Sequence, residues 1–190
     1  MVEETDFYSI LSIAKERDYS FREWVKFLNS YPLTENVIKT LSGVPQGLKY
    51  HPEFCNLKHT YLVFKAVCKI GEHELIEAAF LHDIGKKLCT NVGNNRIYAY
   101  GHAAASADFV KQNKECVQYY DLTYDVVKKH MDFNDPSAAM LKEDQNLRNF
   151  IICDKILSRS LYRVSFPFYD HILNKIKEFW AYESQRNSPN

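Results

Sequence analysis

Apolar residues recur at helical spacing over most of the chain, which predicts helices rather than strands. The run 57–70 shows this most clearly, because one stripe of its positions is apolar throughout except at His59. From Glu72 a second apolar run ends in the pair His82-Asp83. The sequence has no strand with sustained two-residue alternation, no internal repeat and no low-complexity segment. It therefore predicts an all-α fold, a helical bundle.

Residues 6–48 predict two or three short helices that form an N-terminal extension packed on the core. Ser20 is followed three positions later by Glu23, which is the signature of a capping box at a helix start. Pro32 is expected to end that helix, and Thr34 to cap the next one. Glycine and proline then indicate a loop from Gly43 to Pro52.

Residues 49–185 are expected to form the main helical domain, followed by a frayed tail at 186–190. Within this domain, residues 88–101 predict a polar loop. Further helices are expected to begin at His102, near Thr123, near Asn146 and at Pro167.

The composition mainly excludes certain classes of function and structure. Lysine plus arginine and aspartate plus glutamate number 24 each among 190 residues, so no overall basic charge suggests binding to duplex DNA. Five scattered cysteines without a CxxC motif predict reduced thiols instead of disulfides or a zinc knuckle. No signal-peptide core and no apolar run of about 18 residues is present, so we expect a soluble cytoplasmic protein without a membrane partner.

Ionisable side chains interrupt the apolar stripes on five predicted helices. These residues are His59, His82, Asp83, His102, His130 and Asp154. An unpaired buried charge is costly, and the usual remedies are pairing with another charge or coordination to a metal. Imidazole and carboxylate are ligands for borderline divalent metals, and bundles build metal sites from side chains on facing helices.

Each of these residues taken singly is more often a hydrogen-bonded core residue than a ligand. A lone buried aspartate commonly pairs with an arginine or a capped turn. Six such residues on five helices are hard to obtain by chance, so for the whole set the sequence favours a metal site.

The order His59, His82-Asp83, Asp154 is similar to that of the HD-domain metal-dependent phosphohydrolases, and His82-Asp83-Ile84-Gly85-Lys86 matches their signature. From Leu41 to about residue 160 the chain resembles the HD domain attached to bacterial CCA-adding tRNA nucleotidyltransferases. The motifs that carry this resemblance are Leu41-Ser42-Gly43-Val44-Pro45-Gln46, His51-Pro52-Glu53, His59-Thr60, Leu81-His82-Asp83-Ile84-Gly85-Lys86 and Gly101-His102. Phe54-Cys55 stands where the family usually has a glycine. The nucleotidyltransferase head is absent from this sequence, so the resemblance implies the hydrolytic domain and not tRNA extension.

The resemblance implies that His59, His82, Asp83 and Asp154 bind one metal ion. It also implies that His102 and His130 bind a second ion, with Asp83 between the two. The alternative for these two histidines is contact with phosphate, or with the ligands of a single ion. The absence of thiolates favours Mn²⁺, Fe²⁺, Ni²⁺, Co²⁺ or Mg²⁺, one or two per chain, over a closed structural zinc site.

Asp83 and Lys86 are the expected catalytic residues. Asp83 could hold or deprotonate water, and Lys86 could meet phosphate charge. Arg159 and Arg163 are candidates for binding the substrate phosphate, with Arg96 as a weaker one. For each cation the alternative is an exposed side chain. Three further histidines fall off the pattern and are expected to be structural or exposed: His51, His73 and His171.

The expected function is hydrolysis of a phosphate ester in a small nucleotide or an RNA end, either a monoester or a 2′,3′-cyclic diester. The nucleotide preference comes from the resemblance alone. Two alternatives remain open at this stage. One is an oxygenase with two irons in the same scaffold, and the other is a non-catalytic nucleotide-binding module with a structural metal. The sequence does not predict the oligomeric state.

Overall fold

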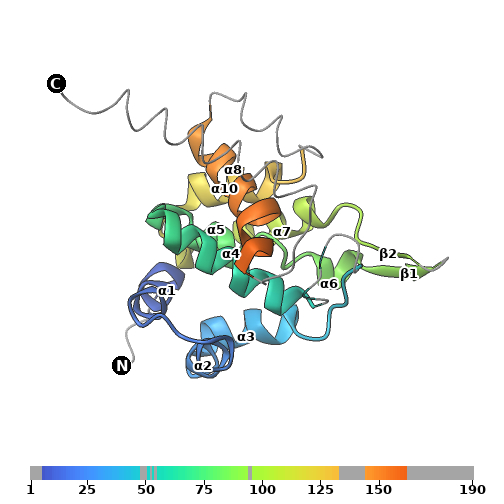
Figure 1. Ribbon diagram of the computed structural model, residues 1–190. Coiled ribbons are helices and arrows are strands. Elements are labelled where there is room, and N and C mark those ends of the chain that lie inside the picture. Colours follow the sequence, from blue (N-terminus) through green and yellow to red (C-terminus); the bar gives the residue numbers. More distant parts are fainter. Residues whose placement is uncertain are drawn as a thin grey trace.

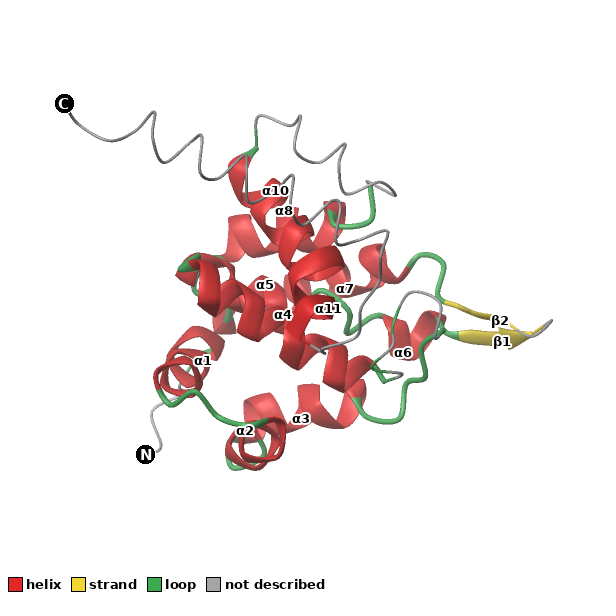
Figure 2. Ribbon diagram, in the orientation of Figure 1, coloured by secondary structure: helices red, strands yellow, loops and turns green. Residues whose placement is uncertain are grey.

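The computed structural model describes residues 6–47, 51, 53, 55–93, 96–132 and 144–161. The prediction of an all-α fold is confirmed, since helices make up nearly all of the regular structure (Figure 2). The helices are α1 (Phe7–Glu16), α2 (Phe21–Leu28), α3 (Pro32–Leu41), α4 (Asn56–Ile70), α5 (Ile76–Leu81), α6 (Lys86–Cys89), α7 (His102–Gln112), α8 (Tyr120–Lys129), α10 (Gln145–Ile152) and α11 (Ser158–Leu161). Short 3₁₀ turns η1 (His73–Leu75) and η2 (Lys114–Cys116), and a π-helical turn η3 (Cys153–Leu157), connect some of them.

The predicted polar loop at 88–101 contains a small antiparallel hairpin that the sequence reading missed. Strands β1 (Asn91–Gly93) and β2 (Arg96–Tyr98) pair with Val92 opposite Ile97. The hairpin projects from the helical body at the right of Figure 1. Three residues per strand are too few to show the two-residue alternation that identifies a strand from sequence.

The three N-terminal helices form as predicted, with one error at a helix start. The capping box is confirmed, because the backbone N–H of Glu23 donates to Ser20 Oγ (3.4 Å) and that of Ser20 to the Glu23 carboxylate (3.0 Å). Thr34 does not cap α3. Pro32 opens this helix, a position where its missing N–H costs nothing, and the hydroxyl of Thr34 instead donates to the Leu28 carbonyl at 2.6 Å.

The N-terminal helices share one hydrophobic core with α4 and α5. The ring of Trp24 lies 5.7 Å from that of Phe64 in α4 and 5.9 Å from that of Phe80 in α5, and Phe7 also contacts Phe80. Figure 1 shows α4 and α5 in the middle of the molecule, with α1–α3 on one side and α8 and α10 on the other. The domain boundary near residue 48 stays a prediction.

Some predictions fall outside the described residues. These are the helix beginning at Pro167, the tail at 186–190, Arg163 and His171. None of the described helices has the length and apolarity needed to span a bilayer.

Glu77 joins α5 to the chain leading into α8. Its side chain is fully buried, and its two carboxylate oxygens accept hydrogen bonds from the backbone N–H groups of Gln118 (3.0 Å) and Tyr119 (2.9 Å). Burial raises the pKa of Glu77, although these hydrogen bonds oppose the shift. The α5–α8 contact also affects the relative positions of His82 and His130, which directly follow these two helices.

We predict that Glu77→Gln destabilises the fold by about 1–3 kcal/mol, because the amide group can accept only one of the two N–H bonds. A raised folded-state pKa adds stability at acid pH that is lost as the pH rises through that pKa. The difference in free energy of unfolding between wild type and Glu77→Gln, the stability gap, should therefore become smaller as the pH rises from 4.5 to 7.5. Urea unfolding at both values measures it, with the exposed Glu74→Gln as control. A gap that widens with pH would contradict this assignment.

Candidate metal centre

The structure brings the six interrupting residues together at one point in the bundle. All are buried, with at most 6% of any of them exposed. His59 lies within α4, whereas most of the others lie at the ends of helices. His82 and Asp83 directly follow α5, His102 is the first residue of α7, His130 directly follows α8, and Asp154 lies in η3. A helix end frees the backbone from regular geometry, so adjacent His82 and Asp83 can both face the centre.

The first group of potential ligands consists of His59, His82 and Asp154. Asp154 Oδ1 lies 2.9 Å from His59 Nε2 and 3.8 Å from His82 Nε2. These side chains come from α4, the turn after α5, and η3. Their ligand atoms all lie within 4.8 Å of one another, which is close enough to share one ion.

The second group consists of Asp83, His102 and His130. Asp83 Oδ1 lies 3.2 Å from His102 Nε2 and 3.7 Å from His130 Nε2. The other oxygen of the same carboxylate, Oδ2, lies 3.3 Å from His82 Nε2 and 3.7 Å from His59 Nε2 in the first group. The Asp83 carboxylate therefore stands between the two groups, with one oxygen facing each.

Three of the imidazoles are oriented by the carbonyl three residues earlier in the chain. The Nδ1 atoms of His82, His102 and His130 lie 3.1, 2.6 and 2.7 Å from the carbonyl oxygens of Ala79, Ala99 and Val127. A carbonyl only accepts, so each Nδ1 carries the proton and donates. In the neutral rings each Nε2 then directs a lone pair into the centre, as in metal-binding histidines.

This arrangement leaves polar atoms without partners. His82 Nε2 is buried and has no hydrogen-bond partner, and the Nε2 atoms of His102 and His130 face each other at 3.2 Å. Two lone pairs at that distance repel unless a cation or a proton lies between them. Four imidazoles and two carboxylates without a thiolate fit one or two hard or borderline divalent ions. The residues present therefore fit the metal that the sequence predicts.

His59 is supported by a carboxylate instead of a carbonyl. Glu53 Oε1 lies 2.8 Å from His59 Nδ1 and 3.0 Å from His51 Nδ1, and the Glu53 side chain is almost fully buried. Burial lowers the pKa of His59, but Asp154 and Glu53 outweigh it and raise that pKa to about 9. Divalent metal ions would compete with this proton.

Sequence reasoning missed the role of this segment. His51 was expected to be structural or exposed. It is hydrogen-bonded to Glu53, as a structural residue would be, and it also lines the cavity at the centre. The sequence signal was the run His51-Pro52-Glu53 shortly before His59. His73 is exposed, as expected.

Lys86 pairs directly with Asp83. Its Nζ lies 2.6 Å from Asp83 Oδ2, and only 8% of the residue is exposed. Burial favours the neutral form of Asp83, yet electrostatic interactions with the neighbouring His82 and Lys86 hold the pKa of this carboxyl well below its usual value. The alternative of an exposed lysine is wrong, because Lys86 is buried at the start of α6.

A cavity of about 480 Å³ opens onto the centre. Asp83, Lys86 and Asp154 line it together with Lys155 and Arg159 from the η3–α11 segment. Arg159 is buried, and one of its Nη atoms donates to the Lys155 carbonyl at 2.6 Å. It is therefore not the exposed arginine of the alternative reading.

Arg96 lies on the hairpin and is exposed, and it is not among the residues that line this cavity, although its neighbour Ile97 is. The weaker expectation that Arg96 contacts the substrate phosphate therefore gains no support from its position.

The segment that carries Asp154 departs from the predicted continuous helix. Residues Cys153–Leu157 form a π-helical turn between α10 and α11. Such turns insert one residue into a helix and are common at functional sites. The register of α11 shifts relative to α10, which places Asp154 and Arg159 on the same cavity wall.

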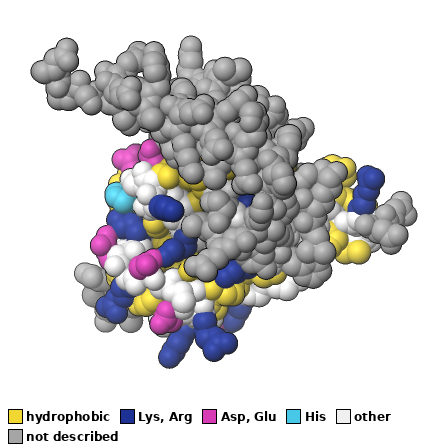
Figure 3. Space-filling view, in the orientation of Figure 1, with side chains coloured by type: hydrophobic (Ala, Val, Ile, Leu, Met, Phe, Trp, Pro, Cys, Tyr) yellow, Lys and Arg dark blue, Asp and Glu magenta, His cyan; other side chains and the backbone are white. Residues whose placement is uncertain are grey.

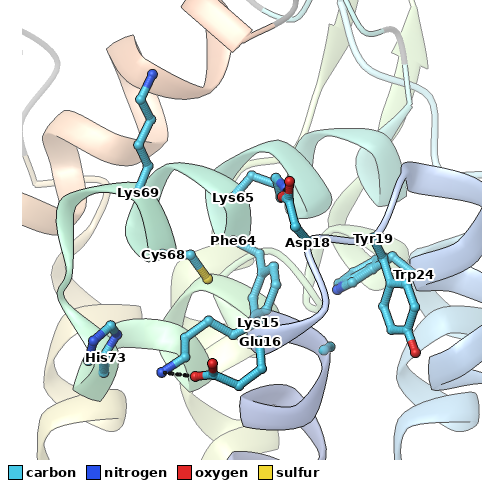
Figure 4. A pocket seen from close by; sticks show the side chains of 11 residues that line it. Lys15, Glu16, Asp18, Tyr19, Trp24, Phe64, Lys65, Cys68, Lys69 and His73 are labelled. Atoms are coloured by element: carbon cyan, nitrogen blue, oxygen red, sulfur yellow. Dashed lines mark hydrogen bonds and ion pairs between the residues drawn. The ribbon is translucent and has the colours of Figure 1, made fainter.

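A second cavity of about 480 Å³ lies between α1, α2 and α4 (Figure 4). Lys15 pairs with Glu16 (3.1 Å), and Lys65 pairs with Asp18. His73 and Cys68 also line it, but among the described residues no metal-ligating cluster occurs there. The chemistry is thus concentrated at the histidine centre.

Gly85 fixes the distance between the His82-Asp83 turn and α7. Its N–H donates to the hydroxyl of Ser106 in α7 at 2.9 Å. A Cβ at this position would overlap the carbonyl oxygen of His102 and lie 2.6 Å from the backbone nitrogen of Ser106. The backbone of Gly85 has an ordinary helical conformation, so close packing and not torsional freedom requires glycine here.

We predict that Gly85→Ala destabilises the fold by about 1–3 kcal/mol through overpacking and weakens metal binding by displacing His102. Gly93→Ala is the matched control, since nothing lies within 4 Å of its added Cβ. Thermal unfolding and titration with Mn²⁺ measure the two effects. Equal metal affinity in both variants would show that the packing of Gly85 does not position His102.

Comparison with known proteins agrees with this geometry. Residues 56–159 match the model of the family described as HD domain. A curated relative, the Multifunctional CCA protein of Hahella chejuensis (strain KCTC 2396), is 32% identical over 82 residues, which cover 43% of this chain and 19% of that protein. The chain thus spans about a fifth of that relative's length, and no solved structure matches it. The matched region contains all six residues of the centre. The chain therefore belongs to the HD-domain family, whose members are typically metal-dependent hydrolases.

Proposed function

We propose that the protein is a metal-dependent phosphohydrolase that acts on nucleotides or RNA-end phosphates, as a phosphomonoesterase or a 2′,3′-cyclic phosphodiesterase. The observation that carries this proposal is the position of Asp83. One buried carboxylate lies between two groups of imidazoles, pairs with Lys86, and opens onto a cavity lined by further cations. Such a site suits a divalent metal and an anionic substrate.

His59, His82, Asp83 and Asp154 would hold one ion, and Asp83, His102 and His130 a second. Mn²⁺, Fe²⁺, Ni²⁺, Co²⁺ and Mg²⁺ all suit these ligands. Divalent ions in such a site supply an activated water and positive charge that polarises the phosphoryl group.

The chain's own residues prepare the site for this chemistry. The carbonyls of Ala79, Ala99 and Val127 hold three imidazoles in the ligating tautomer before any ion binds. Lys86 keeps Asp83 ionised and places a positive charge beside it, where it can meet a phosphoryl oxygen. Arg159 lines the same cavity, which supports a role in binding a second phosphoryl oxygen.

The positively charged side chains that line the cavity also help to distinguish a phosphohydrolase from an oxygenase. Lys86, Lys155 and Arg159 around the cavity favour an anionic substrate, which hydrolysis of phosphate esters requires and an oxygenase does not. The complete set of six potential ligands supports an active metal centre over a degenerate module.

The decisive test is hydrolysis by metal-stripped protein reconstituted with each divalent ion, using nucleoside monophosphates and 2′,3′-cyclic nucleotides. We expect turnover that depends on added metal and that falls more than about 100-fold in Asp83→Asn, beyond the loss typical for residues that only support a ligand. Asp108→Asn, an exposed aspartate of α7, is the control. Folded protein that hydrolyses no ester with any metal would contradict the proposal, and tightly held iron with oxygen consumption would indicate an oxygenase.

We further predict two metal ions per chain. Because Asp83 contributes to both groups, Asp83→Ala should lose both ions, whereas His130→Ala should lose one and keep the other. Elemental analysis after dialysis against Mn²⁺ measures the stoichiometry. One ion in wild type and one in His130→Ala would support the single-metal alternative for His102 and His130.

A further inference from the structure

Large apolar side chains are exposed on the hairpin and on the segments next to it. Leu88, Val92, Tyr98 and Tyr100 are 83%, 72%, 41% and 85% exposed, and the described residues contain few other large apolar side chains so open to solvent. Figure 3 shows hydrophobic surface on the projecting hairpin. Large apolar side chains that are exposed beside a cavity are candidates for ligand binding.

The two tyrosines differ from the other apolar residues of this surface. Tyr98 and Tyr100 line the cavity that contains Asp83 and Lys86, whereas Leu88 and Val92 do not. Their ring centroids lie 5.3 Å apart with the planes tilted by 40°. Tyr100 keeps most of its ring free, so it offers an aromatic face to a molecule in the cavity.

The position of these rings is fixed to the metal centre through the backbone. Ala99, between the two tyrosines, accepts hydrogen bonds at its carbonyl from His102 Nδ1 (2.6 Å) and from the His102 backbone N–H (3.4 Å). Gly101, with φ of +79°, then turns the chain into α7. Two residues span at most about 7.6 Å between Cα atoms, so Tyr100 lies next to His102.

We propose that Tyr98 and Tyr100 form a stacking subsite for the planar base of a nucleotide whose phosphate lies at the metal centre. Lys86, Lys155 and Arg159 supply the charge that attracts the phosphate, and the tyrosines supply an aromatic face for the rest of the molecule. Stacking accepts any base, because every base has an aromatic face. This inference rests on the proposed function and adds the residues that would select a nucleotide over other phosphate esters.

The test compares adenosine 5′-monophosphate with ribose 5-phosphate, which carries a hydroxyl group in place of the base. We expect wild type to show a KM for adenosine 5′-monophosphate lower by about ten-fold, the range that base stacking commonly provides. Tyr100→Leu keeps an apolar side chain but removes the ring. It should raise the KM for adenosine 5′-monophosphate more than the KM for ribose 5-phosphate, so that most of this difference is lost. Tyr100→Phe should retain it.

Val92→Thr is the matched control, since Val92 lies on the same hairpin, is exposed and does not line the cavity. It should leave the KM ratio unchanged. If wild type shows no preference for the base, or if Tyr100→Leu keeps the preference, the stacking subsite is wrong. A change of oligomeric mass in both Tyr100→Leu and Val92→Thr, without a change in KM ratio, would overturn it in favour of an interface.

Binding of adenosine and of ribose to the protein as purified provides a readout independent of turnover, because neither contains an ester bond. Saturation-transfer NMR should detect contact with the adenine ring in wild type and its loss in Tyr100→Leu. Adenosine binding that depends on Tyr100, in a protein that hydrolyses no ester, would leave the subsite standing while the proposed function fails. Hydrolysis of ribose 5-phosphate by a protein that does not bind adenosine would support the proposed function and contradict the stacking subsite.

Discussion

The centre of this molecule is a buried group of two carboxylates and four imidazoles whose charges and lone pairs do not fully balance one another. Asp83 is 1% exposed, and its two oxygens face different histidines. The proton of three of these histidines is already committed to a backbone carbonyl, so their remaining nitrogens have none to offer inward. Burial of unpaired lone pairs is costly, and divalent cations at the centre would remove that cost.

The surrounding helices hold these buried carboxylates and imidazoles in position. Glu77 ties α5 to the start of α8, and Gly85 lets the His82-Asp83 turn approach α7 closely. Asn56, at the start of α4, donates to the Asp83 carbonyl at 3.0 Å and fixes the same turn from another side. Contacts from α4 and α7 thus hold the turn that follows α5, and the position of this turn affects the spacing of the potential ligands.

Helical periodicity predicted most of this arrangement. It placed the six residues on buried faces, because a single polar side chain in an apolar stripe is visible in sequence. It missed features that depend on contacts between distant segments or on few residues. The strands of the hairpin are too short to show two-residue alternation. The π-helical turn at Asp154 shifts the helical register, and no sequence motif indicates this shift. The contact of Glu53 with His59 depends on how a loop folds back onto α4.

The same contrast applies to the cations and aromatic rings of the cavity. Lys86 could be associated with Asp83 from their spacing, but its burial could not. Tyr98 and Tyr100 sit in a segment that reads as a polar loop, and only the hairpin and its hydrogen bonds to His102 bring them to the cavity. The structure, and not the sequence pattern, therefore shows that these rings line the cavity.

We propose that this centre binds two divalent ions, one held by His59, His82, Asp83 and Asp154 and the other by Asp83, His102 and His130. Anomalous diffraction from crystals grown with Mn²⁺ tests it most directly. We predict two anomalous peaks, one between His59, His82 and Asp154 and one between His102 and His130, each within bonding distance of a different Asp83 oxygen. A single peak that leaves His102 and His130 without a metal ion, or no peak at this centre, would contradict the claim.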